Sequence, residues 1–163
     1  MVSQFHPEIY LALHNIRSTH NVGAIFRTAD ATKVTKIYIS GITPAPIDRF
    51  GRERKDIVKA SLGAEKTVEW GNTEDLLMLI KKLKKEKVKI VAIEQDKRSI
   101  DYKEIRKNMK IGERVLIILG NEIKGISSEI LSECDLIAEI PMHGSKESLN
   151  VSVAAGIVLY SMV

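Results

Sequence analysis

The stretch Val115–Gly125 reads VLIILGNEIKG, and it is the part of the sequence that decides the fold class. Five uninterrupted apolar residues are typical of a strand that is buried on both faces, and such strands belong to parallel sheets covered by helices. The polar residues Gly120, Asn121 and Glu122 follow directly, where ligand sites of parallel α/β sheets lie. The stretch therefore predicts a covered parallel sheet with a polar site at its edge.

Apolar and helical patterns alternate on both sides of this stretch. Strands are predicted at Ile9–Leu13, Lys36–Ser40, Lys89–Ile93, Val115–Leu119 and Leu136–Ile140, with Thr67–Trp70 as a weaker candidate. Helices are predicted at Ala24–Thr32, Glu74–Lys87 and Ser127–Ser132, and from about Leu149 to the end. Asn72 or Thr73 is expected to cap the helix at Glu74. This order predicts an α/β fold with a mostly parallel sheet flanked by helices.

Composition narrows the classes of protein. The chain has 163 residues, of which 44% are hydrophobic, so we expect one domain over residues 1–163 without a further RNA-binding domain. A single cysteine, Cys134, excludes an internal disulfide and favours the cytoplasm. No stretch is long and apolar enough for a membrane span. The net charge of +4 is a mild indication of a polyanionic partner.

Three segments carry polar residues that folding alone does not require. In the first, Asn15–Arg27, Arg27 lies in an apolar helical pattern and is expected to be buried, so its guanidinium needs an anionic or polar partner. A salt bridge to Asp30 or Glu122 is the structural alternative. The second segment is Leu119–Gly125, whose Gly-Asn-Glu lacks the spacing of a dinucleotide-binding loop.

The third segment, Ile140–Asn150, opens the last helix. Ser148 is a plausible N-cap, and Asn150 is expected one turn inside a buried apolar helix, where its amide needs partners. Together the three segments offer an arginine, a carboxylate, a hydroxyl and amides, without metal-ligand spacing, a phosphate-binding GxxxxGK or a nucleophilic Gly-x-Ser-x-Gly. This set suits transfer of a group that a cofactor has already activated.

The last helix has an unusual surface, because Glu147 is the final charged residue of the chain. A helix that is apolar nearly all round needs cover on every side. A second subunit is the simplest cover, and we expect an isologous dimer through this helix. Full burial within one chain is the alternative.

Three motifs occur together in order. They are Asn21-Val-Gly-Ala-Ile-Phe-Arg27, Leu119-Gly-Asn-Glu-Ile-Lys-Gly125 and IPMHGSKESLNVSVA from Ile140 to Ala154. With these motifs, and with KASLGAE over Lys59–Glu65, the chain resembles the SpoU-type RNA 2′-O-ribose methyltransferases of the SPOUT superfamily. The resemblance implies a C-terminal trefoil knot, dimerisation that involves the last helix, and S-adenosylmethionine as the methyl donor.

The resemblance also implies roles for individual residues. The methyl donor would be bound by Gly120, Ile140 and Leu149, with Ile93, Asn121 and Met142 as further candidates. The catalytic set would be Asn21, Arg27, Glu122, Ser148 and Asn150. Arg27 is proposed in the family as a base, but arginine stays protonated, so we prefer that it grips a phosphate of the RNA.

RNA contact is expected from the basic loop PAPIDRFGRERKD and from the first segment. The candidate residues are Arg17, Arg49, Arg52, Arg54 and Lys55, which surround the aromatic Phe50. A solvated loop is the alternative. Two other functions also stay open: a SPOUT enzyme that methylates an RNA base, and a knotted module that binds RNA or cofactor without turnover. The sequence does not decide between tRNA and ribosomal RNA.

Overall fold

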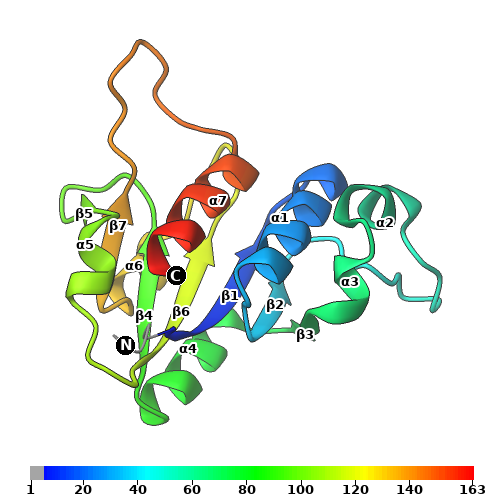
Figure 1. Cartoon of the computed structure of the whole chain (residues 1–163), viewed down its shortest axis with the longest axis horizontal. Coiled ribbons are helices and arrows are strands. Elements are labelled where there is room, and N and C mark those ends of the chain that lie inside the picture. The colour runs from blue at the N-terminus through cyan, green and yellow to red at the C-terminus, as the bar shows by residue number, and fades with distance from the viewer. Residues whose placement is uncertain (1–5) are drawn as a thin grey trace, which may run out of the picture.

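The computed structural model describes residues 6–163 as a seven-stranded sheet with helices on both faces (Figure 1). All six strand pairings are parallel, and the strand order is β3-β2-β1-β6-β4-β7-β5. The strands are β1 (Glu8–His14), β2 (Lys36–Ser40), β3 (Glu69–Thr73), β4 (Val88–Ile93), β5 (Ile100–Asp101), β6 (Arg114–Leu119) and β7 (Leu136–Glu139). The predicted parallel α/β architecture is confirmed.

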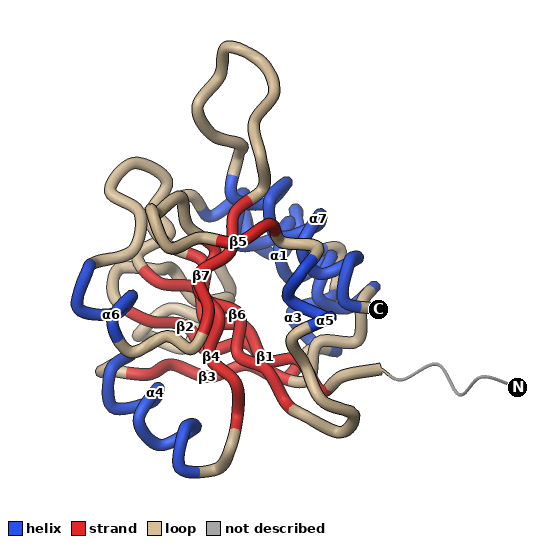
Figure 2. Tube along the Cα trace, turned by 90° about the vertical axis from the view of Figure 1, so that its left-hand side faces the viewer, coloured by secondary structure: helices blue, strands red, loops and turns tan. Residues whose placement is uncertain are grey.

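The helices lie between the strands along the chain. They are α1 (Thr19–Ala31), α2 (Lys55–Ser61), α3 (Ala64–Thr67), α4 (Leu76–Lys85), α5 (Glu104–Lys107), α6 (Ser128–Ser132) and α7 (Val151–Met162). Figure 2 shows α4 and α6 on one side of the sheet and α1 and α7 on the other. No helix among residues 6–163 has the length and apolar character that a bilayer span requires.

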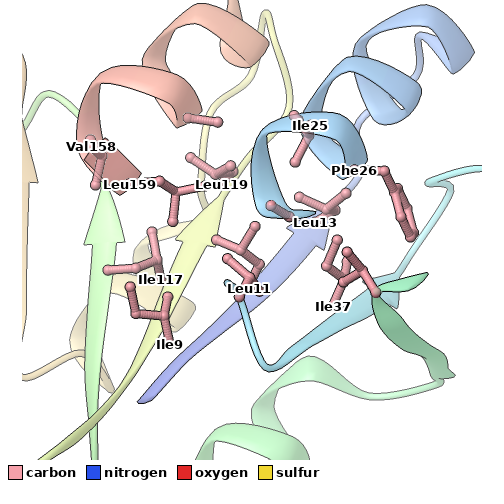
Figure 3. Packing of buried hydrophobic residues seen from close by; sticks show 14 of the residues in the cluster. Ile9, Leu11, Leu13, Ile25, Phe26, Ile37, Ile117, Leu119, Val158 and Leu159 are labelled. Carbon is pink, nitrogen blue, oxygen red and sulfur yellow. The ribbon is translucent and has the colours of Figure 1, made fainter. Parts of the chain in front are cut away.

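Each face of the sheet has its own apolar cluster. Leu11, Leu13 and Ile117 point from the strands toward α1 and α7, where they meet Phe26 and Leu159 (Figure 3). The intervening residues of the same strands point to the opposite face. There Ala12, Leu116 and Ile118 are in one cluster with apolar side chains of α4 and α6. This double burial explains the nearly continuous apolar runs in the sequence.

Strand register places the edge of the sheet where the site lies. Leu13 of β1 pairs with Leu119 of β6, and Leu119 pairs with Ile93 of β4. The three central strands therefore end at one level. The polar residues that follow them come from distant parts of the sequence but meet at the same edge.

Several predicted boundaries are wrong because capping groups lie elsewhere. Helix α1 begins at Thr19 rather than Ala24, since the Ser18 hydroxyl accepts from Asn21 N at 3.2 Å. Helix α4 is capped by Asp75, which accepts from Met78 N at 3.1 Å. Asn72 and Thr73, the predicted caps, belong to β3. The weaker strand is real but shifted, because Thr67 ends α3.

The start of α7 also corrects the prediction. Asn150, not Ser148, is the N-cap of α7, and its Oδ1 accepts from Ser152 N at 2.8 Å. Asn150 is therefore exposed at the start of the helix rather than buried one turn inside it. Val153 and Tyr160 are 49% and 59% exposed, so full burial of this helix within one chain is wrong.

Candidate functional site

A cleft of about 590 Å³ opens at the carboxyl ends of β4, β6 and β7. We call it the carboxylate-lined cleft, because its lining holds five carboxylates and two basic side chains. The carboxylates are those of Glu94, Asp96, Glu122, Glu139 and Glu147, and the basic side chains are Arg98 and Lys124. In a chain whose net charge is +4, this is a local excess of negative charge. Such a lining favours a ligand that carries positive charge.

All six residues predicted to bind a cofactor line this cleft. They are Ile93, Gly120, Asn121, Ile140, Met142 and Leu149. They come from the ends of three strands and from the segment before α7, so the fold brings separate motifs together.

The Gly120–Ile126 loop forms one wall and is closed by its own hydrogen bonds. Asn121 Oδ1 accepts from Ile123 N at 2.9 Å and from Lys124 N at 2.8 Å, and Gly125 N donates to Asn121 O at 3.0 Å. Gly125 has a φ of +66°, which favours glycine. The Asn121 amide also donates to Asn15 O at 2.8 Å, which ties this wall to the end of β1.

A polar network borders the cleft where α1 meets α7. Asn21 is 8% exposed, donates to Glu122 Oε1 at 3.4 Å and accepts from Asn150 Nδ2 at 3.2 Å. Glu122 also accepts from the backbone N–H groups of Arg17 at 3.3 Å and Ser18 at 3.5 Å. Thus one residue from each of the three motifs is joined through Asn21.

The network fixes the charge of Glu122. Desolvation raises the pKa of this carboxyl, but hydrogen bonds from backbone N–H groups, including that of Arg17, and from Asn21 outweigh it. The net result is a pKa below the ordinary value. Glu122 is therefore an ionised acceptor that holds Asn21 in one orientation. Ser148 lines the same cleft and is exposed.

Arg27 does not lie where the sequence predicts. Helix α1 turns Ile25, Phe26 and Ala29 into the core, so Arg27 points away and is exposed. Arg27 makes no hydrogen bond or ion pair within residues 6–163 and lines neither of the clefts described here. The salt-bridge alternatives are also wrong, because Asp30 accepts from Thr67 and Glu122 from Asn21.

A second cleft, of about 550 Å³, lies beside the loop that follows β2. We call it the arginine-lined cleft, because Arg17, Arg49 and Arg54 all line it. Arg52 instead binds Asp48 at 3.0 Å. Lys55 lies outside the lining, since it begins α2. Three of the five residues predicted to contact RNA thus share one hollow.

An exposed aromatic ring stands next to these arginines. Phe50 is 66% exposed, and the guanidinium groups of Arg49 and Arg52 lie 4.8 Å and 5.0 Å from its ring centre. A ring framed by cations suits stacking and phosphate contact. Arg17 links the two clefts, because it lines this one and its backbone N–H donates to Glu122, which lines the other.

Sequence reasoning missed the residues that follow β4. Glu94, Gln95, Asp96 and Arg98 all line the carboxylate-lined cleft. The signal was present, since Glu94 follows a buried strand just as Gly120 does, and the same strand-end rule applies to both. Within residues 6–163 no group of three or more His, Cys, Asp or Glu side chains could hold a metal ion.

Comparison with known proteins gives a single family. Residues 8–160 match the SpoU rRNA Methylase family. The chain is 31% identical over 153 residues to the 23S rRNA (guanosine-2′-O-)-methyltransferase RlmB of Neisseria meningitidis, covering 94% of this chain and 57% of that protein. It is 32% identical to the tRNA (guanosine(18)-2′-O)-methyltransferase of Aquifex aeolicus, covering 90% and 64%.

Solved structures with a similar fold are also RNA methyltransferases. The AdoMet-bound rRNA methyltransferase of Sinorhizobium meliloti superposes with a TM-score of 0.81 at 29% identity, covering 96% of this chain and 56% of that one. The chain therefore spans less than two thirds of the length of these relatives.

Proposed function

Because the chain belongs to the SpoU rRNA methylase family, we propose that it transfers a methyl group from S-adenosylmethionine to the 2′-hydroxyl of a ribose in tRNA or ribosomal RNA. One observation carries the proposal. The polar residues of three separated motifs meet through Asn21, between a cleft rich in carboxylates and a cleft rich in arginines. The first suits a cationic donor and the second suits a polyanionic acceptor.

The carboxylate-lined cleft fits the methyl donor in size and charge. Its volume of about 590 Å³ lies within the range of small-molecule sites. Gly120, Ile140 and Leu149 would hold the donor, with Ile93, Asn121 and Met142 beside them. When bound, S-adenosylmethionine supplies a methyl group activated by a positively charged sulfonium, which an excess of carboxylates attracts.

The chain's own residues then have to orient the acceptor. Asn21 is fixed from both sides, by Glu122 and by Asn150, so its position is set before any RNA arrives. Ser148, which lines the cleft, would contact the acceptor ribose. Arg17, Arg49 and Arg54 contact the RNA backbone, since their guanidinium groups suit phosphate. Lys55 and Arg52 add charge around this surface.

Arg27 completes the site from a second copy of the chain. In one copy it is exposed and outside both clefts. It lies one residue from Thr28, whose Cγ2 is 4.0 Å from the place where a Cβ on Gly156 would lie. Gly156 is three residues after Val153 and four before Tyr160 in α7, so the spacing puts it on the same helix face as these two exposed side chains. A dimer that covers this surface carries Arg27 to the partner, where it grips a phosphate and lets phosphate or water take the hydroxyl proton.

Two further features belong to the proposal. The last helix passes through the loop that contains Gly120–Ile126, which makes the C-terminal trefoil knot. The reaction takes place in the cytoplasm, where a reducing environment suits the single Cys134. Burial raises the pKa of this thiol to about 11, so it is protonated and poorly reactive there.

The test is methyl transfer from labelled S-adenosylmethionine to purified tRNA and ribosomal RNA, with the products mapped by alkaline cleavage. A 2′-O-methyl group removes the hydroxyl that alkali uses, so we expect label together with one protected position. Label without protection would make the chain a base methyltransferase. Donor binding without label on any RNA would make it a binding module.

The dimer has a separate test. Copies with Arg27→Ala and copies with Asn150→Ala are each expected to lose activity, and a mixture is expected to regain part of it. Recovery follows because a mixed dimer contains one site with both residues. A mixture as inactive as its parts would place Arg27 in its own copy's site.

A further inference from the structure

Two adjacent residues directly after β4 make hydrogen bonds to three separate parts of the carboxylate-lined cleft. Glu94 N donates to Ala138 O of β7 at 2.9 Å, and Glu94 Oε2 accepts from Ile126 N at 2.9 Å. The next residue, Gln95, donates from its side-chain amide to Glu147 O at 2.5 Å. The pair thus joins the strand ends, the Gly120–Ile126 loop and the segment before α7.

Glu94 is fitted closely to the Gly120–Ile126 loop. A Cβ added to Gly125 would lie 2.2 Å from Glu94 Oε2, so the carboxylate occupies the space that a side chain would need. The other oxygen, Oε1, accepts from Gln95 N at 2.9 Å. Both carboxylate oxygens are therefore held by backbone N–H groups. This arrangement fixes the loop in a single position relative to β4.

Gln95 holds a segment that has few other ties. Residues 142–146 make no hydrogen bond within residues 6–163, and His143–Asn150 are exposed. Figures 1 and 2 show this loop extending away from the sheet between β7 and α7. The bond from Gln95 fixes it at Glu147, and the bond from Asn150 to Asn21 fixes its end. Along the chain, Met142 precedes and Leu149 follows Glu147, the residue that Gln95 contacts, and both of them line the cleft.

We propose that Glu94 and Gln95 are positioning residues for the methyl donor, Glu94 through the Gly120–Ile126 loop and Gln95 through the Met142–Leu149 segment. The inference rests on the proposed function, since it assigns roles within that site. Neither side chain makes a hydrogen bond to Asn21, Glu122 or Asn150, so we assign neither residue a direct contact with the acceptor. The pair instead restricts the walls to the conformation that binds, and restriction before binding raises affinity.

Steady-state kinetics distinguishes a residue that positions the donor, which changes the KM for S-adenosylmethionine, from a residue that acts on the acceptor, which changes kcat. Without these bonds the walls sample open conformations, and only the competent fraction binds the donor. The KM for S-adenosylmethionine then rises. At a saturating donor concentration the walls are closed again, and kcat keeps its wild-type value.

The first variant is Gln95→Met, which keeps the length of the side chain, removes the amide donor to Glu147 O and adds no charge to the cleft. We expect binding of S-adenosylhomocysteine, measured by calorimetry, to weaken about tenfold. The KM for S-adenosylmethionine should rise by a similar factor. We expect kcat and the melting temperature of the ligand-free protein to stay unchanged. The matched control is Lys97→Ala, two residues away and exposed, which should bind as the wild type does.

The second variant is Glu94→Gln, which replaces one of the two accepting oxygens by a donor. Hydrogen exchange of the ligand-free protein distinguishes the two roles. Glu94→Gln should speed exchange in residues 120–126, where Ile123, Lys124 and Ile126 donate backbone hydrogen bonds. Gln95→Met should leave the exchange of residues 120–126 unchanged, because Gln95 binds Glu147 and not this loop. A residue that only supports the fold would raise exchange across β4, β6 and β7 and lower the melting temperature.

The outcomes separate this inference from the function on which it rests. A wild-type protein that binds no S-adenosylhomocysteine overturns both. A wild-type protein that binds it, with Gln95→Met and Glu94→Gln binding equally well and with Glu94→Gln exchanging at the wild-type rate in residues 120–126, overturns the inference alone. A fall in kcat at saturating donor would move these residues into the acceptor machinery and would also overturn it.

Discussion

The two clefts of this molecule are built on opposite principles, although Arg17 belongs to one and touches the other. The carboxylate-lined cleft is walled by backbone whose position is fixed by short internal hydrogen bonds. The arginine-lined cleft owes its charge to long exposed side chains, those of Arg17, Arg49 and Arg54. Ligand binding by a rigid wall should fall sharply when one atom is displaced. Binding by a charged surface should instead fall in small steps that depend on the salt concentration.

Substitution of Gly125 should give the largest effect. Gly125→Val adds left-handed backbone strain of about 1–2 kcal/mol and forces the Glu94 carboxylate away, so donor affinity should fall about 100-fold. Gly112→Val is the matched control, because Gly112 has a φ of +81° and no atom within 4 Å of an added Cβ. Calorimetry with S-adenosylhomocysteine measures both, and equal losses would show that strain alone matters. Thermal melting of each variant verifies that it is folded.

Asn21→Ala should give the next largest effect, and it should appear in kcat. The variant removes the side-chain donor to the ionised Glu122 and leaves Asn150 Nδ2 without its acceptor. A hydrogen bond to a charged group is worth about 1.5–3 kcal/mol, which corresponds to about 10- to 150-fold in rate. Steady-state methyl transfer measures it, with Asn108→Ala, at the C-cap of α5, as a remote control. An unchanged kcat with a raised donor KM would place Asn21 in the donor site instead.

The sequence could predict the fixed part of the molecule better than the exposed part. The run at Val115–Leu119 indicates a central buried strand because burial on both faces leaves a continuous apolar pattern. A helix cap depends on a single side-chain hydrogen bond, and several nearby residues can often make it. Asp75 and Asn150 are the caps, although Thr73 and Ser148 close by have side chains that could also cap a helix. The exposure of Arg27 was not predicted, because the apolar residues on both sides of it in the sequence hide which face of α1 meets the core.

The contacts of Glu94 and Gln95 were beyond sequence reasoning for a different reason. Their partners, Ile126 and Glu147, are 32 and 52 residues away along the chain. Both partners are backbone groups, whose identity leaves no mark in the sequence. A strand-end rule could point to the positions, but only the folded chain shows what they hold.

Loss of one arginine from the arginine-lined cleft should have a modest and graded effect. Arg49→Ala should raise the KM for RNA about three- to tenfold and lower the slope of log affinity against log salt by about 0.7–0.9. Arg52→Ala is the sharp comparison, because Asp48 already binds that guanidinium at 3.0 Å and the effect should be smaller. Binding measured over a salt series checks both. Losses that are independent of salt would contradict an electrostatic role.

The smallest effect should be the pH dependence that comes from Glu122. Its pKa is lowered in the folded chain, so its contribution to stability is present above the ordinary value of 4.5 and is lost as the pH falls through the lowered value. Thermal melting of wild type and Glu122→Gln should therefore differ at neutral pH and converge in acid. Since the donors to Glu122 are neutral N–H groups, added salt should leave the difference nearly unchanged, unlike the binding of RNA by Arg49. A difference that persists in strong acid would mean that packing rather than ionisation of Glu122 supports the site.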